Sequence, residues 1–185
     1  TMHTLKIAFI CASLRKDSIN RKLENSIIRL FEEKGAKTQI INLDKFQMPI
    51  FHGDLKTPGN VKILTTLLET FDGIVITTPE YNGCLPPLLK NMIDWTSTES
   101  TDYIKNAIWG IASATPGPMS GIMCMRQLSF ILSRLGGDVL SQQVGCGNAS
   151  SSLDCDGNLI AQPALSFAKK MCEMMISRIN QKKMI

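Results

Sequence analysis

Histidine is nearly missing from this 185-residue sequence, which contains only His3 and His52. Two imidazoles exclude a histidine metal cluster, and we expect no metal site. A Ser-His-Asp triad would have to use His52, but the G-x-S-x-G turn that presents a serine nucleophile is absent. The cysteines form no C-x-x-C pair, which removes zinc-ribbon, thioredoxin-like and iron–sulfur sites. We expect all six to be small buried side chains in a reduced compartment, namely Cys11, Cys84, Cys124, Cys146, Cys155 and Cys172.

Long apolar runs are also missing, since no stretch approaches the roughly 18 residues that span a bilayer. The first residues, 1–6, lack the shape of a signal peptide. Apolar residues make up 44% of the chain and charged residues 19%, as in ordinary folded proteins. We therefore expect a cytoplasmic protein with no membrane partner, folded as one domain over residues 1–185, in which residues 1–4 are a tag remnant without order.

The charge of the chain is small, with a net value of +4. Basic residues are scattered, apart from the pair Lys182 and Lys183. Nucleic-acid-binding proteins usually carry a clustered basic face with interleaved aromatic residues. We expect no nucleic-acid partner.

Short apolar runs alternate with amphipathic helical patterns along the whole chain. The patterns predict helices over 19–35, 61–71, 88–95, 119–135 and 165–179. Between them lie five runs typical of buried strands: 6–12, 38–43, 73–77, 107–112 and 139–140. Strict alternation predicts an α/β fold, a doubly wound five-stranded parallel sheet of order 2-1-3-4-5 with helices on both faces.

Three polar loops follow the strands whose carboxyl ends form the usual ligand site of such a sheet. The first contains Ser13, Arg15, Ser18 and Asn20 at the start of a helix. Free N–H groups and the positive helix end favour a phosphate there, and Arg15 can add a charge-assisted bond. Neither G-x-G-x-x-G nor G-x-x-x-x-G-K-[ST] is present, so a phosphate monoester fits better than a dinucleotide or ATP. Alternatively, Ser18 is merely a helix cap and Arg15 a solvated charge.

The second loop, residues 78–87, has prolines at both ends and Asn82-Gly83 at its centre. Prolines stiffen the loop, and Asn-Gly tolerates positive φ. A stiff loop with exposed N–H groups can bond the polar edge of a flat ring, although a plain turn would have the same sequence. The third loop covers residues 113–120.

The whole chain resembles the NADPH-dependent FMN reductase family, flavodoxin-like enzymes that include quinone, azo and chromate reductases. The resemblance lies in Ser13-x-Arg15-x-x-Ser18-x-Asn20, in residues 78–83 with Lys90-Asn91 and Asp94-Trp95, and in residues 156–159. It implies FMN bound without metal: the four residues of the first motif hold its phosphate, and Ser113, Pro116 and Gly117 close the other side. The ring and ribityl chain would be lined by Pro79, Glu80, Tyr81, Asn82 and Gly83.

Bound flavin would carry the chemistry, so we expect no catalytic side chain. NADPH or NADH would pass a hydride through flavin N5 to a small-molecule acceptor such as a flavin, quinone, azo compound or chromate. Two alternatives remain. One is a flavodoxin-type electron carrier without its own NAD(P)H activity, which the charge of +4 disfavours because such carriers tend to be acidic. The other is a phosphate-site sensor or scaffold without flavin.

Apolar residues surround the helix predicted at 119–135 almost completely. A helix that is apolar all round is usually buried on both sides. In so small a domain a second subunit would cover one side, and the family resemblance also implies a homodimer or homotetramer. The alternative is that this methionine-rich helix is simply core.

Overall fold

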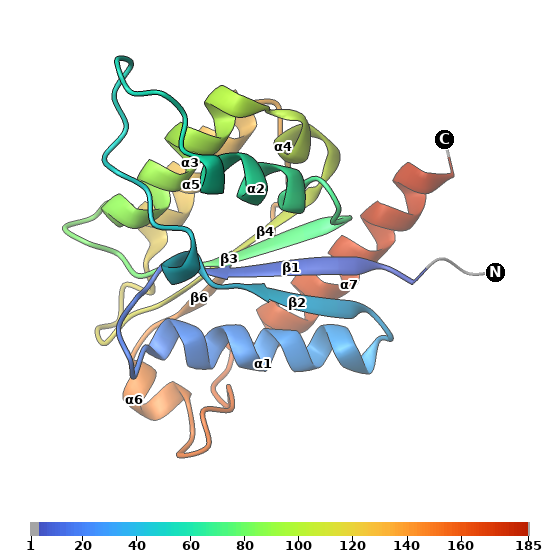
Figure 1. Cartoon of the computed structure of the whole chain (residues 1–185). Helices are drawn as coiled ribbons and strands as arrows, with labels where there is room; N and C mark the ends of the chain where they lie inside the picture. Colours follow the sequence, from blue (N-terminus) through green and yellow to red (C-terminus); the bar gives the residue numbers. More distant parts are fainter. Residues whose placement is uncertain (1–3, 185) are drawn as a thin grey trace.

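A computed structural model describes residues 4–184 of the chain. Within these residues the sheet has six parallel strands (Figure 1). They are β1 (Lys6–Cys11), β2 (Lys37–Ile41), β3 (Gly73–Thr77), β4 (Ile108–Ala114), β5 (Asp138–Val139) and β6 (Val144–Cys146). The order is β2-β1-β3-β4-β5, which confirms the predicted doubly wound topology.

Alternating side chains of the central strands pack against two separate helical layers. Ala8 and Ile10 of β1 lie in one buried cluster, while Ile7 and Phe9 lie in the other. Both faces of β1 are therefore covered, and this explains its uninterrupted apolar sequence. The same alternation holds in β3, where Ile74 and Val75 belong to opposite clusters.

Helices cover the two faces unequally (Figure 1). One face carries α2 (Gly59–Leu68), α3 (Pro87–Glu99), α4 (Asp102–Asn106) and α5 (Ile122–Arg134). The other carries α1 (Ile19–Glu33) and α7 (Ala164–Lys183), which contact each other, with the short α6 (Ala149–Ser152) at their end. A 3₁₀ turn, η1 (Leu43–Lys45), follows β2.

The fifth position of the sheet is divided, which the sequence pattern did not predict. β5 pairs with Ile108 and Trp109 of β4, and β6 pairs with residues 112–114 farther along the same strand. Strands of two and three residues are too short to produce a periodic pattern, and this is why β6 was missed. β4 also extends to Ala114, so Ser113 lies in a strand and not in a loop. Likewise, α5 begins at Ile122 because Ser120 and Gly121 have positive φ.

Two further expectations concern burial and the first residues. All six cysteines are free, but Cys84 and Cys155 are exposed, so the prediction that all six are buried was wrong for these two. Cys84 directly follows the 82–83 turn, and Cys155 lies within a turn. The expected tag remnant falls on residues 1–3, which lie outside the described residues, and on the exposed Thr4.

Among residues 4–184 no helix combines the length and the apolar character that crossing a membrane requires.

Candidate functional site

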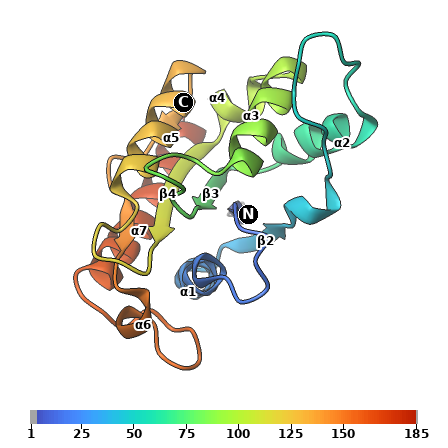
Figure 2. The same ribbon diagram turned by 90° about the vertical axis from the view of Figure 1, so that its left-hand side faces the viewer.

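Three loops meet at the carboxyl ends of β1, β3 and β4, on the side that Figure 2 turns toward the viewer. Backbone hydrogen bonds place them side by side. Ala12 N–H donates to the Thr77 carbonyl at 2.8 Å, and Thr78 N–H donates to the Ala112 carbonyl at 3.0 Å. The three loops predicted from sequence are therefore adjacent in the structure.

The first loop, residues 13–18, offers charge and free backbone donors. Arg15 is exposed, and within the described part of the chain the N–H groups of Ile19 and Asn20 meet no acceptor. Ser18 caps α1 by accepting from Arg21 N–H, while the hydroxyl of Ser13 accepts from Arg15 N–H. A helix N-terminus with unbonded N–H groups and a neighbouring guanidinium fits a phosphate. The hydroxyls of both serines can still donate.

Asn20 is buried, and its amide spans the gap between two loops. Its Nδ2 donates to the Ala114 carbonyl at 3.0 Å, and its Oδ1 accepts from Ala114 N–H at 2.8 Å. Both ends of the side chain are thus used for joining α1 to β4. Asn20 fixes the position of the first loop relative to the third, and its backbone N–H remains available to a ligand.

The second loop contains a two-residue hairpin. Tyr81 and Cys84 exchange backbone hydrogen bonds of 3.0 Å in both directions. Asn82 and Gly83 between them have φ of 53° and 73°, the signature of a type I′ turn, for which Asn-Gly is the preferred sequence. Within residues 4–184 the N–H groups of Asn82 and Gly83 have no protein acceptor. They are suited to bond the polar edge of a ring.

Glu80 connects the second loop to α5. Its carboxylate accepts from Met123 N–H at 3.1 Å and from Cys124 N–H at 3.0 Å. These are free donors at the start of α5, where a negative charge is stabilised by the helix dipole. Gly121, which precedes that helix, would bring a Cβ within 2.0 Å of the Ser113 hydroxyl, so this junction has no room for a side chain. The carboxylate of Glu80 therefore positions the hairpin.

The third loop closes on itself through Thr115. Its hydroxyl donates to the Gly117 carbonyl at 2.9 Å and accepts from Ser120 N–H at 3.1 Å. Pro116 and Gly117 are exposed at its tip. Ser113 is fully buried, and its hydroxyl donates to the Thr78 carbonyl at 2.6 Å. Its side chain thus ties the second loop to β4.

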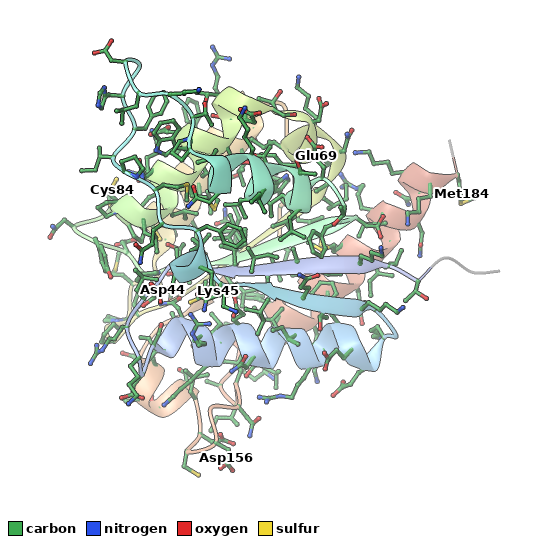
Figure 3. The ribbon with its side chains drawn as sticks, viewed as in Figure 1. Asp44, Lys45, Glu69, Cys84, Asp156 and Met184 are labelled. Carbon is green, nitrogen blue, oxygen red and sulfur yellow. The ribbon has the colours of Figure 1, made fainter. Side chains whose placement is uncertain are left out.

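Other residues of the sequence motifs hold loops in place. Asn91 accepts from Phe51 N–H, and both Asn91 and the Trp95 indole donate to the Pro49 carbonyl. These bonds fasten the irregular stretch 46–58 to α3. On the opposite side of the sheet from Cys84, the turn labelled by Asp156 in Figure 3 is held against α1 by Ser26.

Sequence reasoning missed one residue beneath the first loop, Glu24. It is fully buried on α1, four residues after Asn20 and three before the buried Ile27. A glutamate at a position of the helix that faces the core is the signal that could have revealed it. Burial raises the pKa of Glu24 to about 7, against a smaller opposing effect of Arg21.

The buried thiols near the loops are held in the neutral form. Burial raises the pKa of Cys124 to about 11 and also raises the pKa of Cys11. A thiol is a nucleophile only as a thiolate. The site therefore offers binding and orientation, and its buried cysteines supply no nucleophile at neutral pH.

Comparison with known families identifies the chain. The family model described as NADPH-dependent FMN reductase matches residues 5–151. This range includes all three loops. The chain belongs to this family. Membership makes the protein an NAD(P)H-dependent oxidoreductase that uses FMN.

Relatives of this reductase include quinone reductases. A 2-hydroxy-1,4-benzoquinone reductase from Burkholderia sp is 25% identical over 166 residues, which are 85% of this chain and 87% of the relative. The quinone reductase of Escherichia coli K12 is 28% identical over 143 residues, 75% of this chain and 74% of the relative. In fold the chain is similar to FerB, a flavoenzyme NAD(P)H:(acceptor) oxidoreductase from Paracoccus denitrificans, with a TM-score of 0.81, 24% identity, and coverage of 96% and 98%.

Proposed function

We propose that this reductase binds FMN across the three loops and transfers a hydride from NADPH or NADH to a small-molecule acceptor. One observation carries the proposal. Unbonded N–H groups of the α1 N-terminus and of the 82–83 turn lie at the same end of the sheet, on adjacent loops. Free donors on two adjacent loops suit a ligand with an anionic tail and a flat polar head.

Each loop has a separate task in this proposal. The phosphate is held by the first loop. Ser13 and Ser18 contribute hydroxyl groups, Arg15 contributes its guanidinium group, and Asn20 contributes its backbone N–H. Pro79, Tyr81, Asn82 and Gly83 line the ring, with Glu80 fixing their position through α5. The third loop closes the other side with Pro116 and Gly117, and Ser113 supports it from below.

When bound, FMN supplies the redox chemistry by accepting a hydride at N5 and passing it to the acceptor. The second loop would orient the ring for the nicotinamide and then for the acceptor. The proposal assigns no step to Cys11 and Cys124, which are neutral because burial raises the pKa of each thiol. We infer a quinone as the first acceptor to test, because several relatives are quinone reductases; flavins, azo compounds and chromate are the others.

Steady-state kinetics test this function directly. The purified protein is loaded with FMN, and NADPH and NADH oxidation are followed with each acceptor in turn. We expect turnover with at least one nicotinamide and a quinone. Tight FMN binding without NAD(P)H oxidation would instead indicate an electron carrier, and absence of FMN binding would refute the proposal.

We also propose that the protein is a homodimer or homotetramer in the cytoplasm. Large apolar side chains of α5 are exposed, with Met123 at 54% and Phe130 at 70% of their full accessibility. Beside them lies a groove of about 610 Å³, lined by Leu85 of the second loop and by residues of α3 and α5 that include Pro87 and Phe130. A second copy of the chain would remove this surface from water. Six free cysteines agree with a reducing compartment.

A further inference from the structure

Glu24 is a buried carboxyl group without a hydrogen-bond partner. The residue is fully buried, and neither carboxylate oxygen accepts a hydrogen bond from any described residue. Its nearest cation is Arg21, whose Nη1 lies 3.9 Å from Oε1, an ion-pair distance too long for a hydrogen bond. A buried carboxylate in such surroundings is costly, so the neutral form is favoured at modest pH.

The same arginine links Glu24 to the first loop. Arg21 Nη2 lies 3.5 Å from the carbonyl oxygen of Ser13, the residue that opens the loop. The charge of Glu24 also contributes, after burial, to raising the pKa of Cys11 at the end of β1. Glu24 therefore lies beneath the loop to which the proposed function assigns the phosphate.

Few ionisable groups face this carboxyl. Arg21 on its own helix is the cation, and Cys11 contributes a thiol from β1 that is neutral because burial raises its pKa. Thr77 of β3, the partner of Cys11 in the strand register, carries an uncharged hydroxyl. Burial raises the pKa of Glu24 to about 7, so its charge changes within the range in which FMN binding is measured.

We propose that binding of the FMN phosphate promotes protonation of Glu24, which takes its proton from solvent. The inference rests on the proposed function, because it takes the phosphate to bind at residues 13–18. A phosphate dianion above the loop and a carboxylate below it are like charges, so the bound phosphate favours the neutral acid. By linkage, ionisation of Glu24 at higher pH weakens phosphate binding by the same factor. Once Glu24 is neutral, the charge of Arg21 is no longer shared with a carboxylate.

Binding measured at several pH values tests this coupling. Dissociation constants for FMN are determined by flavin fluorescence between pH 6 and pH 8.5 for the wild type and for Glu24→Gln, which has nearly the same shape without the charge. We expect equal affinities at pH 6 and wild-type binding weaker than the variant by about tenfold at pH 8.5. Riboflavin, which lacks the phosphate, serves as the matched ligand, and with it the ratio of the two affinities should not change with pH.

Calorimetry provides a second measurement. FMN titrations at pH 7.5 in buffers of different ionisation enthalpy should show greater proton uptake by the wild type than by Glu24→Gln, and the subtraction removes the proton of the phosphate itself. In the wild type alone, carbon-13 NMR of labelled glutamate should show one carboxyl becoming protonated when FMN is added. This last readout does not depend on the folding of a variant.

The possible results separate the two proposals. Failure of the wild type to bind FMN at any pH would overturn the proposed function. FMN binding with an affinity ratio that is constant with pH, or that changes equally with riboflavin, would overturn the role of Glu24 and leave the function standing. An NMR titration in which no glutamate changes protonation on FMN addition would overturn it as well.

Discussion

Arg15 is the exposed residue whose replacement tests whether the start of α1 binds a phosphate or is only a capped helix end. Replacing Arg15 with alanine should weaken FMN binding about tenfold, because a charge-assisted hydrogen bond to phosphate is lost. Fluorescence titration at fixed ionic strength measures the effect. Lys16→Ala is the matched control, since Lys16 is an exposed cation of the same loop, and should change affinity about twofold. Equal losses in both variants would indicate general attraction by positive charge in place of a specific contact.

Glu24 should make the stability of the flavin-free protein depend on pH. Its pKa is about 7 in the folded protein, above the ordinary value of 4.5 that applies when the chain is unfolded. The unfolded state therefore loses its proton first, and Glu24 lowers the free energy of unfolding as pH rises from about 4.5 to 7. Glu24→Gln should match the wild type at pH 5 and exceed it at pH 8 by on the order of 1–3 kcal/mol.

Urea unfolding at the two pH values measures this difference. A gap between variant and wild type that is the same at pH 5 and pH 8 would mean that ionisation of Glu24 contributes nothing. The measurement needs no flavin, so it examines the burial of the carboxyl independently of ligand binding.

At the scale of elements, the hairpin of the second loop depends on α5. Glu80→Ala leaves the N–H groups of Met123 and Cys124 without their acceptor. The free energy of unfolding should fall by about 1–2 kcal/mol, as for other lost helix caps, and FMN affinity should fall with it. Glu80→Gln keeps an acceptor oxygen and should recover most of both losses.

Thermal or urea unfolding, followed by FMN titration, measures these effects. Glu69→Ala is the control, because Glu69 is an exposed glutamate that directly follows α2 (Figure 3). If Glu80→Ala weakened FMN binding and Glu80→Gln did not restore it, the carboxylate would contact the flavin itself.

For the molecule as a whole, the exposed apolar face of α5 bears on whether the protein forms an oligomer. Phe130→Glu places a charge at the most exposed large apolar side chain of α5 and should disrupt an apolar contact between subunits. Sedimentation velocity at micromolar concentration should show an oligomer for the wild type and monomer for the variant. Ile63→Glu on α2 is the control, because Ile63 is similarly exposed, at 64%, on a different helix. A monomeric wild type would refute the assembly.

The sequence by itself determined the fold and the position of the loops. Uninterrupted apolar strands alternating with amphipathic helices require a parallel sheet covered on both faces, and the carboxyl ends of its strands bring residues 13–18, 78–87 and 115–120 together. The Asn82-Gly83 turn was also readable, because few residue pairs tolerate positive φ at two successive positions.

Only the tertiary structure decided what each polar side chain does. Asn20 and Ser113 lie in sequence motifs that are typical of ligand contacts. In the structure, however, the Asn20 side chain donates to the Ala114 carbonyl and the Ser113 hydroxyl donates to the Thr78 carbonyl, because neighbouring elements place these acceptors there. Glu80 bonds the start of α5, a segment more than forty residues away in the chain. The environment of Glu24 likewise depends on packing between α1 and the sheet, since desolvation arises from elements that are distant in sequence.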